Sequence, residues 1–217
     1  MAKIIGIIQV KGGVGRSTIA TNIAGVMSLK NKTALIDCDM PQGTSASWYS
    51  IREQQGKAGN LTAATAKDHK ELVAQVERLS ADHQLIIIDC PPRIAEITRA
   101  ALILSDLCLI PLGASAPEIW ATSDLLTTIS EAKQVKPKVD ARLVWNRYRA
   151  TTSSAQELSA AVHTGLSLAE MKTKLGMRVA YSDALARGLT VMEWTDKAAR
   201  DEIGQLATEA TQILRTR

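Results

Sequence analysis

A glycine-rich segment near the amino terminus does most to restrict the fold of this chain. The run "KGGVGRST", residues 11–18, joins an apolar stretch, residues 3–10, to a segment with helical spacing, residues 17–30. Glycines in such a turn let the backbone bend sharply and approach an anion closely. Successive N–H groups and the start of the following helix then point at phosphate oxygens. The segment therefore predicts a strand, a phosphate-binding loop and a helix, with a tight turn that binds no ligand as the alternative.

The loop departs from the standard phosphate-loop pattern GxxxxGK[ST] at two positions. Val10 stands where that pattern has its first glycine, and Arg16 stands where it has a lysine. Ser17 is placed to give its hydroxyl to Mg²⁺, and Thr18 starts the helix. An arginine keeps the positive charge but is longer and planar, so it is not equivalent to lysine at a crowded phosphate site.

Apolar runs and helical stretches alternate along the rest of the chain. The predicted strands cover residues 3–10, 33–39, 60–65, 84–90, 106–112, 141–146 and 177–181. The predicted helices cover residues 17–30, 44–56, 70–81, 94–105, 117–134, 153–174 and 196–215. This alternation predicts an α/β fold with a doubly wound, mostly parallel sheet and helices on both faces. Neither a repeat nor a linker interrupts it, so we expect one domain, residues 1–217.

Composition agrees with such a sheet and excludes several other classes of protein. Aromatic residues make up 3% of the chain and Phe is absent, so the core is aliphatic, as in parallel sheets. Cys38, Cys90 and Cys108 lie in apolar runs without a CxxC pair, which predicts reduced buried thiols. No apolar run approaches the roughly 18 residues that span a bilayer. The apolar amino terminus has no signal cleavage site, so we expect a cytoplasmic protein.

Three aspartates follow apolar runs, at the predicted ends of strands. Asp89 comes after four apolar residues, where a purely structural carboxylate is costly, so a metal role is favoured over a turn or helix cap. Asp37 and Asp39 are two residues apart and face the same side of a strand. Two carboxylates that face one site suit an Mg²⁺ shell and an attacking water. Turn capping before Pro41 and Gly43 is the alternative for this pair.

Four motifs together resemble the ParA/MinD family, the deviant Walker A type of P-loop NTPase. The loop "KGGVG" opens with the family's signature lysine, here Lys11. The segment "IDCDMPQGT" matches the family's DxDPQG with Met40 inserted before the proline, and "LIIIDCPP" matches its Walker B strand. The fourth motif, "VWNR", supplies Asn146 and Arg147 near the end of a later strand. The motifs stand in family order and cover most of residues 1–150, whereas the last 60 residues match loosely.

The resemblance implies an ATPase that uses ATP and Mg²⁺. The nucleotide-binding residues that it implies are Lys11, Gly12, Gly13, Val14, Gly15, Arg16, Ser17, Thr18, Asn146 and Arg147. The implied metal residues are Ser17, Asp37 and Asp89. The implied catalytic residues are Lys11, Asp37, Asp39 and Arg16.

The resemblance also implies what these catalytic residues would do. Asp39 would position or activate the attacking water, and Asp37 would support the metal shell. Lys11 would reach the nucleotide of a partner chain and neutralise the charge that develops during cleavage, which implies an ATP-dependent sandwich homodimer. With Arg16 in the loop, we expect ATP to bind and hydrolysis to be strongly slowed or lost. A nucleotide-dependent scaffold that does not hydrolyse ATP is the alternative.

The resemblance also implies what the ATPase does. Small ParA-like proteins bind non-specific double-stranded DNA as ATP-bound dimers, and a ParB-like or adaptor protein on the cargo stimulates hydrolysis. The implied function is to segregate or position a plasmid, a chromosome or a protein assembly, with nucleoid association in the ATP state. The chain starts just before its first strand, so we expect no DNA-reading domain ahead of it.

The charge distribution fits DNA binding by the carboxyl-terminal part. Residues 1–132 hold 12 basic and 13 acidic side chains, whereas residues 133–217 hold 14 and 9. A basic surplus suits salt-sensitive binding to phosphates. The candidate contacts are Lys172, Lys174, Arg178, Arg187, Lys197, Arg200, Arg215 and Arg217.

A MinD-like membrane anchor is the alternative use of the last predicted helix. Its apolar stripe consists of Ile203, Leu206, Ala207, Ala210, Ile213 and Leu214. The helix has no Trp or Phe and carries acidic residues, whereas an interfacial anchor needs bulky apolar residues opposite a basic face. We therefore expect it to pack on the domain and no membrane partner.

Overall fold

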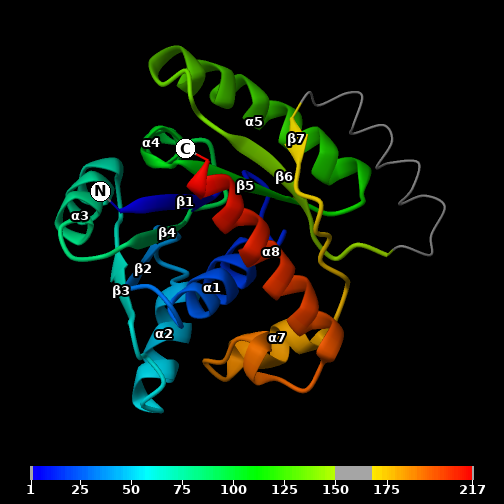
Figure 1. Cartoon of the computed structure of the whole chain (residues 1–217). Helices are drawn as coiled ribbons and strands as arrows, with labels where there is room; N and C mark the ends of the chain where they lie inside the picture. Colours follow the sequence, from blue (N-terminus) through cyan, green and yellow to red (C-terminus); the bar gives the residue numbers. More distant parts are fainter. Residues whose placement is uncertain (1, 150–167, 217) are drawn as a thin grey trace.

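Seven strands form one parallel sheet in the computed structural model, which describes residues 2–149 and 168–216 (Figure 1). The strands are β1 (Lys3–Ile7), β2 (Thr33–Asp37), β3 (Leu61–Thr65), β4 (Leu85–Asp89), β5 (Leu107–Leu112), β6 (Ala141–Trp145) and β7 (Ala169–Glu170). Their order across the sheet is β3-β2-β4-β1-β5-β6-β7, and every neighbouring pair is parallel. The first strand therefore lies at the centre, and the loop that follows it opens at the middle of the sheet.

Helices cover both faces of the sheet, as predicted (Figure 1). They are α1 (Arg16–Met27), α2 (Thr44–Gln54), α3 (His69–Ser80), α4 (Glu96–Leu104), α5 (Ala116–Val135), α7 (Val179–Ala186), the short 3₁₀ helix η1 (Val191–Glu193) and α8 (Lys197–Arg215). One apolar cluster joins the sheet to α3, α4 and α5, and a second joins it to α1, α2, α7 and α8. The fold is thus the predicted doubly wound α/β architecture.

The apolar runs of the sequence read as continuous because both faces of each central strand are buried. Ile4 and Ile86 point into the cluster with α3, α4 and α5, whereas Ile5 and Ile87 point into the opposite cluster. Successive side chains on a strand face opposite sides of the sheet, so each face takes every second residue. The three cysteines are free and buried, as the sequence predicts.

The predicted strand over 177–181 is wrong, since α7 starts at Val179. Short apolar runs do not separate strand from helix by periodicity alone. Here Ala180, Tyr181 and Ala184 are buried at helical spacing against the second cluster. Helix formation therefore buries one side of this run.

The predicted helix over 153–174 is wrong for its described part, residues 168–174. This segment is extended and contains β7, and the backbone N–H of Met171 donates to the carbonyl of Leu143 on the neighbouring strand β6. Met171 and Thr173 are buried while Lys172 is exposed, which is the period of a strand. The rest of that prediction, residues 153–167, lies outside the described residues.

The closing helix α8 packs on the domain, as predicted. Its stripe residues Ile203, Leu206, Ala207, Ala210 and Leu214 are all buried in the second apolar cluster. The apolar surface that a membrane anchor would use is therefore covered by the protein itself. Within residues 2–149 and 168–216, the structure holds no helix with the length and apolarity to cross a bilayer.

Candidate nucleotide-binding site

The predicted site residues converge at one edge of the sheet. The glycine-rich loop follows β1, Asp37 ends β2, Asp89 ends β4 and Asn146 comes directly after β6. All four strands are parallel, so their carboxyl ends share an edge, where ligands bind in open α/β sheets. Asp37 and Asp89 are register partners on neighbouring strands. The fold thus assembles a site from segments that are far apart in the sequence.

The loop has the conformation of an anion cradle. Gly13 and Gly15 adopt φ values of 75° and 92°, in the left-handed region that favours glycine. Gly15 is also the residue before α1, and as a glycine it offers no side chain to cap the first N–H groups of that helix. Unpaired N–H groups at a helix start and the helix dipole together attract an anion. The loop can therefore take a phosphate group without rearranging its backbone.

Asn146, which directly follows β6, supports this loop from two strands away in the sheet. Its Nδ2 donates to the carbonyl of Val14 at 2.7 Å, and the side chain is buried. A Cβ atom on Gly15 would lie 2.2 Å from that Nδ2, so only glycine fits beside the amide. Because a carbonyl only accepts hydrogen bonds, this contact orients the amide and leaves its Oδ1 as the acceptor for a ligand.

Arg16 turns behind the loop and binds backbone carbonyls. Its Nε donates to the carbonyl of Cys90 at 2.8 Å, and its Nη1 donates to the carbonyls of Gln9, at 2.8 Å, and Lys11. Its Nη2 lies 3.8 Å from a carboxylate oxygen of Asp39. Burial lowers the pKa of Arg16, against the opposing effect of nearby carboxylates. The guanidinium thus ties the ends of β1 and β4 together, with most of its donors used by the protein.

Asp37 and Asp39 have different surroundings. Asp37 is buried, and its two oxygens accept the backbone N–H groups of Asp39 and Ala46, each at 2.9 Å. This is the turn-capping role that the sequence left as the alternative. Asp39 stays partly exposed at the site, and burial raises its pKa while Arg16 lowers it and Asp37 raises it further. Asp39 is therefore the carboxylate of this pair that a ligand or water can reach.

Asp89 carries the feature that best fits a metal ion. It is fully buried; its Oδ2 accepts the hydroxyl of Ser45 at 2.7 Å, and its Oδ1 has no hydrogen-bond partner among the described residues. Burial raises the pKa of Asp89 to about 7; the hydroxyls of Ser45 and Ser17 lower it, whereas Asp37 raises it. A buried carboxylate oxygen without a donor suits Mg²⁺ or one of its waters, because hard cations take oxygen ligands.

A cavity of about 1030 Å³ extends from the loop past Asn146. Tyr148, Met177 and Tyr181 are among the residues that line it. Sequence reasoning missed these three residues, since two of them come from the loosely matched last 60 residues and no spacing marks them. Arg147, predicted as a nucleotide contact, also lines the cavity.

The conformation of Arg147 sets it apart from its neighbours. It has a φ of 52°, which is uncommon for a residue other than glycine, and its Nη2 lies 3.5 Å from the carboxylate of Glu118. Glu118 in turn accepts the N–H of Gly113 at the end of β5. The segment after β6 is thereby tied to the start of α5.

Lys11 lies partly exposed beside the exposed glycines Gly12 and Gly13. The Lys11 ammonium group has no hydrogen bond or ion pair with any residue in the part of the chain that the structure describes. Its side chain is available to a group outside its own loop.

The candidate DNA contacts do not form one patch. Lys174 and Arg178 line the nucleotide cavity; the Lys174 Nζ lies 4.3 Å from the Tyr148 ring centroid, and Arg178 pairs with Glu202 at 2.8 Å. Arg187 lies 4.9 Å from the ring centroid of Trp194.

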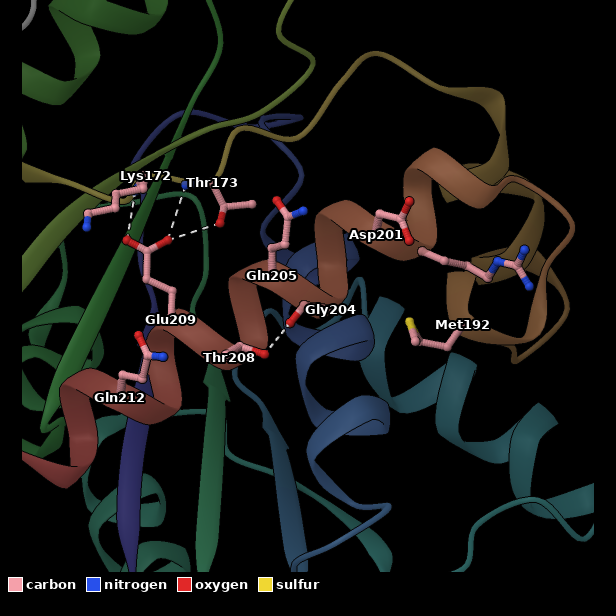
Figure 2. A pocket seen from close by; sticks show the side chains of 10 residues that line it. Lys172, Thr173, Met192, Asp201, Gly204, Gln205, Thr208, Glu209 and Gln212 are labelled. Atoms are coloured by element: carbon pink, nitrogen blue, oxygen red, sulfur yellow. Dashed lines mark hydrogen bonds between the residues drawn. The ribbon is translucent and has the colours of Figure 1, made fainter.

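The other candidates lie along α8 or beside it. Lys172 and Arg200 line an open groove on α8, where the carboxylate of Glu209 accepts the N–H groups of Lys172 and Thr173 and the Thr173 hydroxyl (Figure 2). Lys197 and Arg215 occupy opposite ends of the helix, about 27 Å apart at a rise of 1.5 Å per residue. Arg217 lies outside the described residues.

Comparison with known proteins decides the family. A family model described as an AAA domain matches residues 2–68 and 55–141, which together span more than half of the chain. The chain belongs to this family and is a ParA-like P-loop ATPase. The family and the fold predicted from the four motifs are therefore confirmed.

Two relatives and one solved structure are similar to this ATPase. It is 27% identical over 208 residues to the maintenance of carboxysome distribution protein A of Halothiobacillus neapolitanus, with 94% of each chain covered. It is 31% identical over 172 residues to the chromosome partitioning protein ParA of Myxococcus xanthus, covering 62% of this chain and 60% of that one. A structure of apo McdA from Cyanothece superposes with a TM-score of 0.79 at 17% identity and covers 97% and 100% of the two chains. That last likeness shows the fold.

Proposed function

We propose that this ParA-like ATPase binds ATP with Mg²⁺ and forms a sandwich homodimer in which Lys11 of each chain reaches the nucleotide of the other. The observation that carries the proposal is that the Lys11 ammonium group has no partner among the described residues, beside a loop whose glycines Gly13 and Gly15 are left-handed. Phosphoryl transfer depends on positioning and on neutralising charge at the phosphates. Lys11 of a second chain would add a cation that neutralises charge at the phosphates.

The other site residues would bind the metal ion, position the attacking water or contact the adenine base. Ser17 and Asp89 would hold Mg²⁺, which would neutralise the negative charge of the phosphates. Asp39 would position the attacking water, and Asp37 would hold the backbone of Asp39 in place. Asn146 would contact adenine, with Arg147 beside it at the base end of the cavity.

We propose that the ATP-bound dimer binds double-stranded DNA without sequence preference and positions a cargo. The named functions of the two relatives, carboxysome distribution and chromosome partitioning, support a positioning role. A ParB-like or adaptor protein on the cargo would stimulate hydrolysis, and the protein would be cytoplasmic, associated with the nucleoid in its ATP state. The candidate DNA contacts that remain outside the nucleotide cavity are Lys172, Arg187, Lys197, Arg200 and Arg215.

DNA binding is expected only in the ATP state, and its affinity is expected to fall steeply with salt. Each phosphate neutralised adds a slope of about −0.9 to the plot of log affinity against log salt. Fluorescence anisotropy with a random-sequence duplex measures both effects. Binding is compared with ATP and with ADP, at salt concentrations between about 50 and 200 mM.

Charge reversal locates the surface. Lys197→Glu with Arg200→Glu on α8 should weaken binding and flatten the salt slope. Lys70→Glu with Arg78→Glu on α3, on the opposite face of the sheet, reverses the same number of charges and should change neither. Binding that is insensitive to salt, or absent in the ATP-bound dimer, would show that the DNA proposal is wrong.

A further inference from the structure

Ser45 is a buried hydroxyl that the motif analysis leaves unexplained. It lies in the first turn of α2, is fully inaccessible to solvent and donates its hydroxyl to Asp89 Oδ2 at 2.7 Å. It is not the cap of its helix, because Gly43 occupies that position. A buried hydroxyl without a hydrogen-bond partner is costly, and the bond to Asp89 supplies that partner.

The bond fixes how Asp89 presents its second oxygen. The terminal torsion of an aspartate side chain is broad, so an unrestrained carboxylate can rotate. With Oδ2 held by Ser45, the plane of the carboxylate is set, and Oδ1 is left without a partner among residues 2–149 and 168–216.

The position of Ser45 is itself set by the fold. The next residue, Ala46, donates its N–H to Asp37 Oδ2 at 2.9 Å, so the first turn of α2 is bound to the ends of both β2 and β4. These two bonds hold the start of the helix against register partners in the centre of the sheet. The hydroxyl is therefore in place before any ligand arrives, as a supporting shell should be.

We propose that Ser45 is a positioning residue of the magnesium site, which holds Asp89 so that its Oδ1 faces the water shell of the metal. The inference rests on the proposed function, since it concerns the Mg²⁺ that would accompany ATP. Groups that orient a metal-binding side chain typically contribute about 10–100-fold to metal affinity. A residue that only fills space in the core would affect nucleotide binding equally with and without the metal.

The test is the Mg²⁺ dependence of nucleotide binding by the full chain with Ser45→Ala. Fluorescence of mant-ATP is titrated with Mg²⁺, and mant-ATP affinity is measured separately in EDTA. We expect the Mg²⁺ concentration at half-saturation to rise by about 10–100-fold, with the affinity in EDTA unchanged. Binding of Mn²⁺ with bound nucleotide, followed by electron paramagnetic resonance, should weaken in parallel.

Two further variants separate the hydrogen bond from packing. Ser45→Cys fills the site with a larger atom, whereas alanine leaves space, but it offers only a weak donor, so it should give the same shift and keeps the test decisive if the alanine variant unfolds. Ser105→Ala is the matched control, because Ser105 is also fully buried and donates to the carbonyl of Ala101 away from the site. This control should leave the Mg²⁺ dependence unchanged.

An unchanged Mg²⁺ half-saturation in both Ser45 variants would overturn the inference. An equal loss of mant-ATP affinity in EDTA would also overturn it, since that result assigns Ser45 a packing role. If the unsubstituted chain itself shows no Mg²⁺-dependent binding of mant-ATP, the proposed function fails and the role of Ser45 fails with it.

Discussion

Arg16→Lys is expected to raise the rate of ATP hydrolysis by at least about tenfold, which corresponds to about 1.4 kcal/mol of transition-state stabilisation. The reason is that the hydrogen-bond donors of Arg16 are already bound to other groups of the protein. Its guanidinium binds the carbonyls of Cys90, Gln9 and Lys11, and its remaining nitrogen is directed toward Asp39. A lysine ammonium is a compact charge on a flexible stem, so it can approach phosphate oxygens that the tied guanidinium does not face.

Phosphate release under saturating ATP and Mg²⁺ measures this effect. Arg16→Gln is the matched control, because it removes the charge as well as the backbone ties and should not increase the rate. The lysine variant must therefore exceed both the unsubstituted chain and the glutamine variant. No gain in rate with lysine would contradict the explanation and would favour the scaffold that does not hydrolyse ATP.

Gly15→Ala is expected to weaken ATP binding by about 100-fold or more, equivalent to about 2.7 kcal/mol. The added Cβ would lie 2.2 Å from Asn146 Nδ2, so the amide that supports the loop must move. The residue also has a φ of 92°, and an L side chain in the left-handed region costs roughly 1–2 kcal/mol. The substitution thus strains the loop and displaces the proposed adenine contact together.

Isothermal titration calorimetry with ATP and Mg²⁺ checks this prediction. Gly204→Ala on α8 is the control, since a Cβ there meets no atom within 4 Å. Alanine is also the better helix former, so this control should bind ATP normally and unfold at a slightly higher temperature. Normal affinity in the Gly15 variant would show that the cradle described for this loop does not hold the nucleotide.

The strand ends explain why much of the candidate site could be predicted. Once the loop after β1 was recognised, parallel topology required Asp37, Asp89 and Asn146 to lie at the same edge. Their chemistry followed from residue type and from the family resemblance. The short segments were harder, because 177–181 has the apolar residues of a strand yet buries them at helical spacing in α7.

Contacts between distant segments could not be predicted from the sequence. Nothing in the order of residues shows that Ser45 donates to Asp89, or that Arg16 binds the carbonyl of Cys90, 74 positions away. Charge counting likewise grouped Lys174 and Arg178 with the DNA candidates, although both line the nucleotide cavity. Each of these features depends on the three-dimensional packing of loops, which carries no local periodicity.

In the proposed dimer, ATP joins two copies of this chain through a site that Lys11 completes. Sedimentation velocity with no nucleotide, with ADP and Mg²⁺, and with ATP and Mg²⁺ tests this dimerisation. We expect the 23.4 kDa monomer in the first two conditions and twice that mass with ATP, with the dimer lost in Lys11→Ala. A chain that stays monomeric while saturated with ATP, or that dimerises regardless of nucleotide, would contradict it.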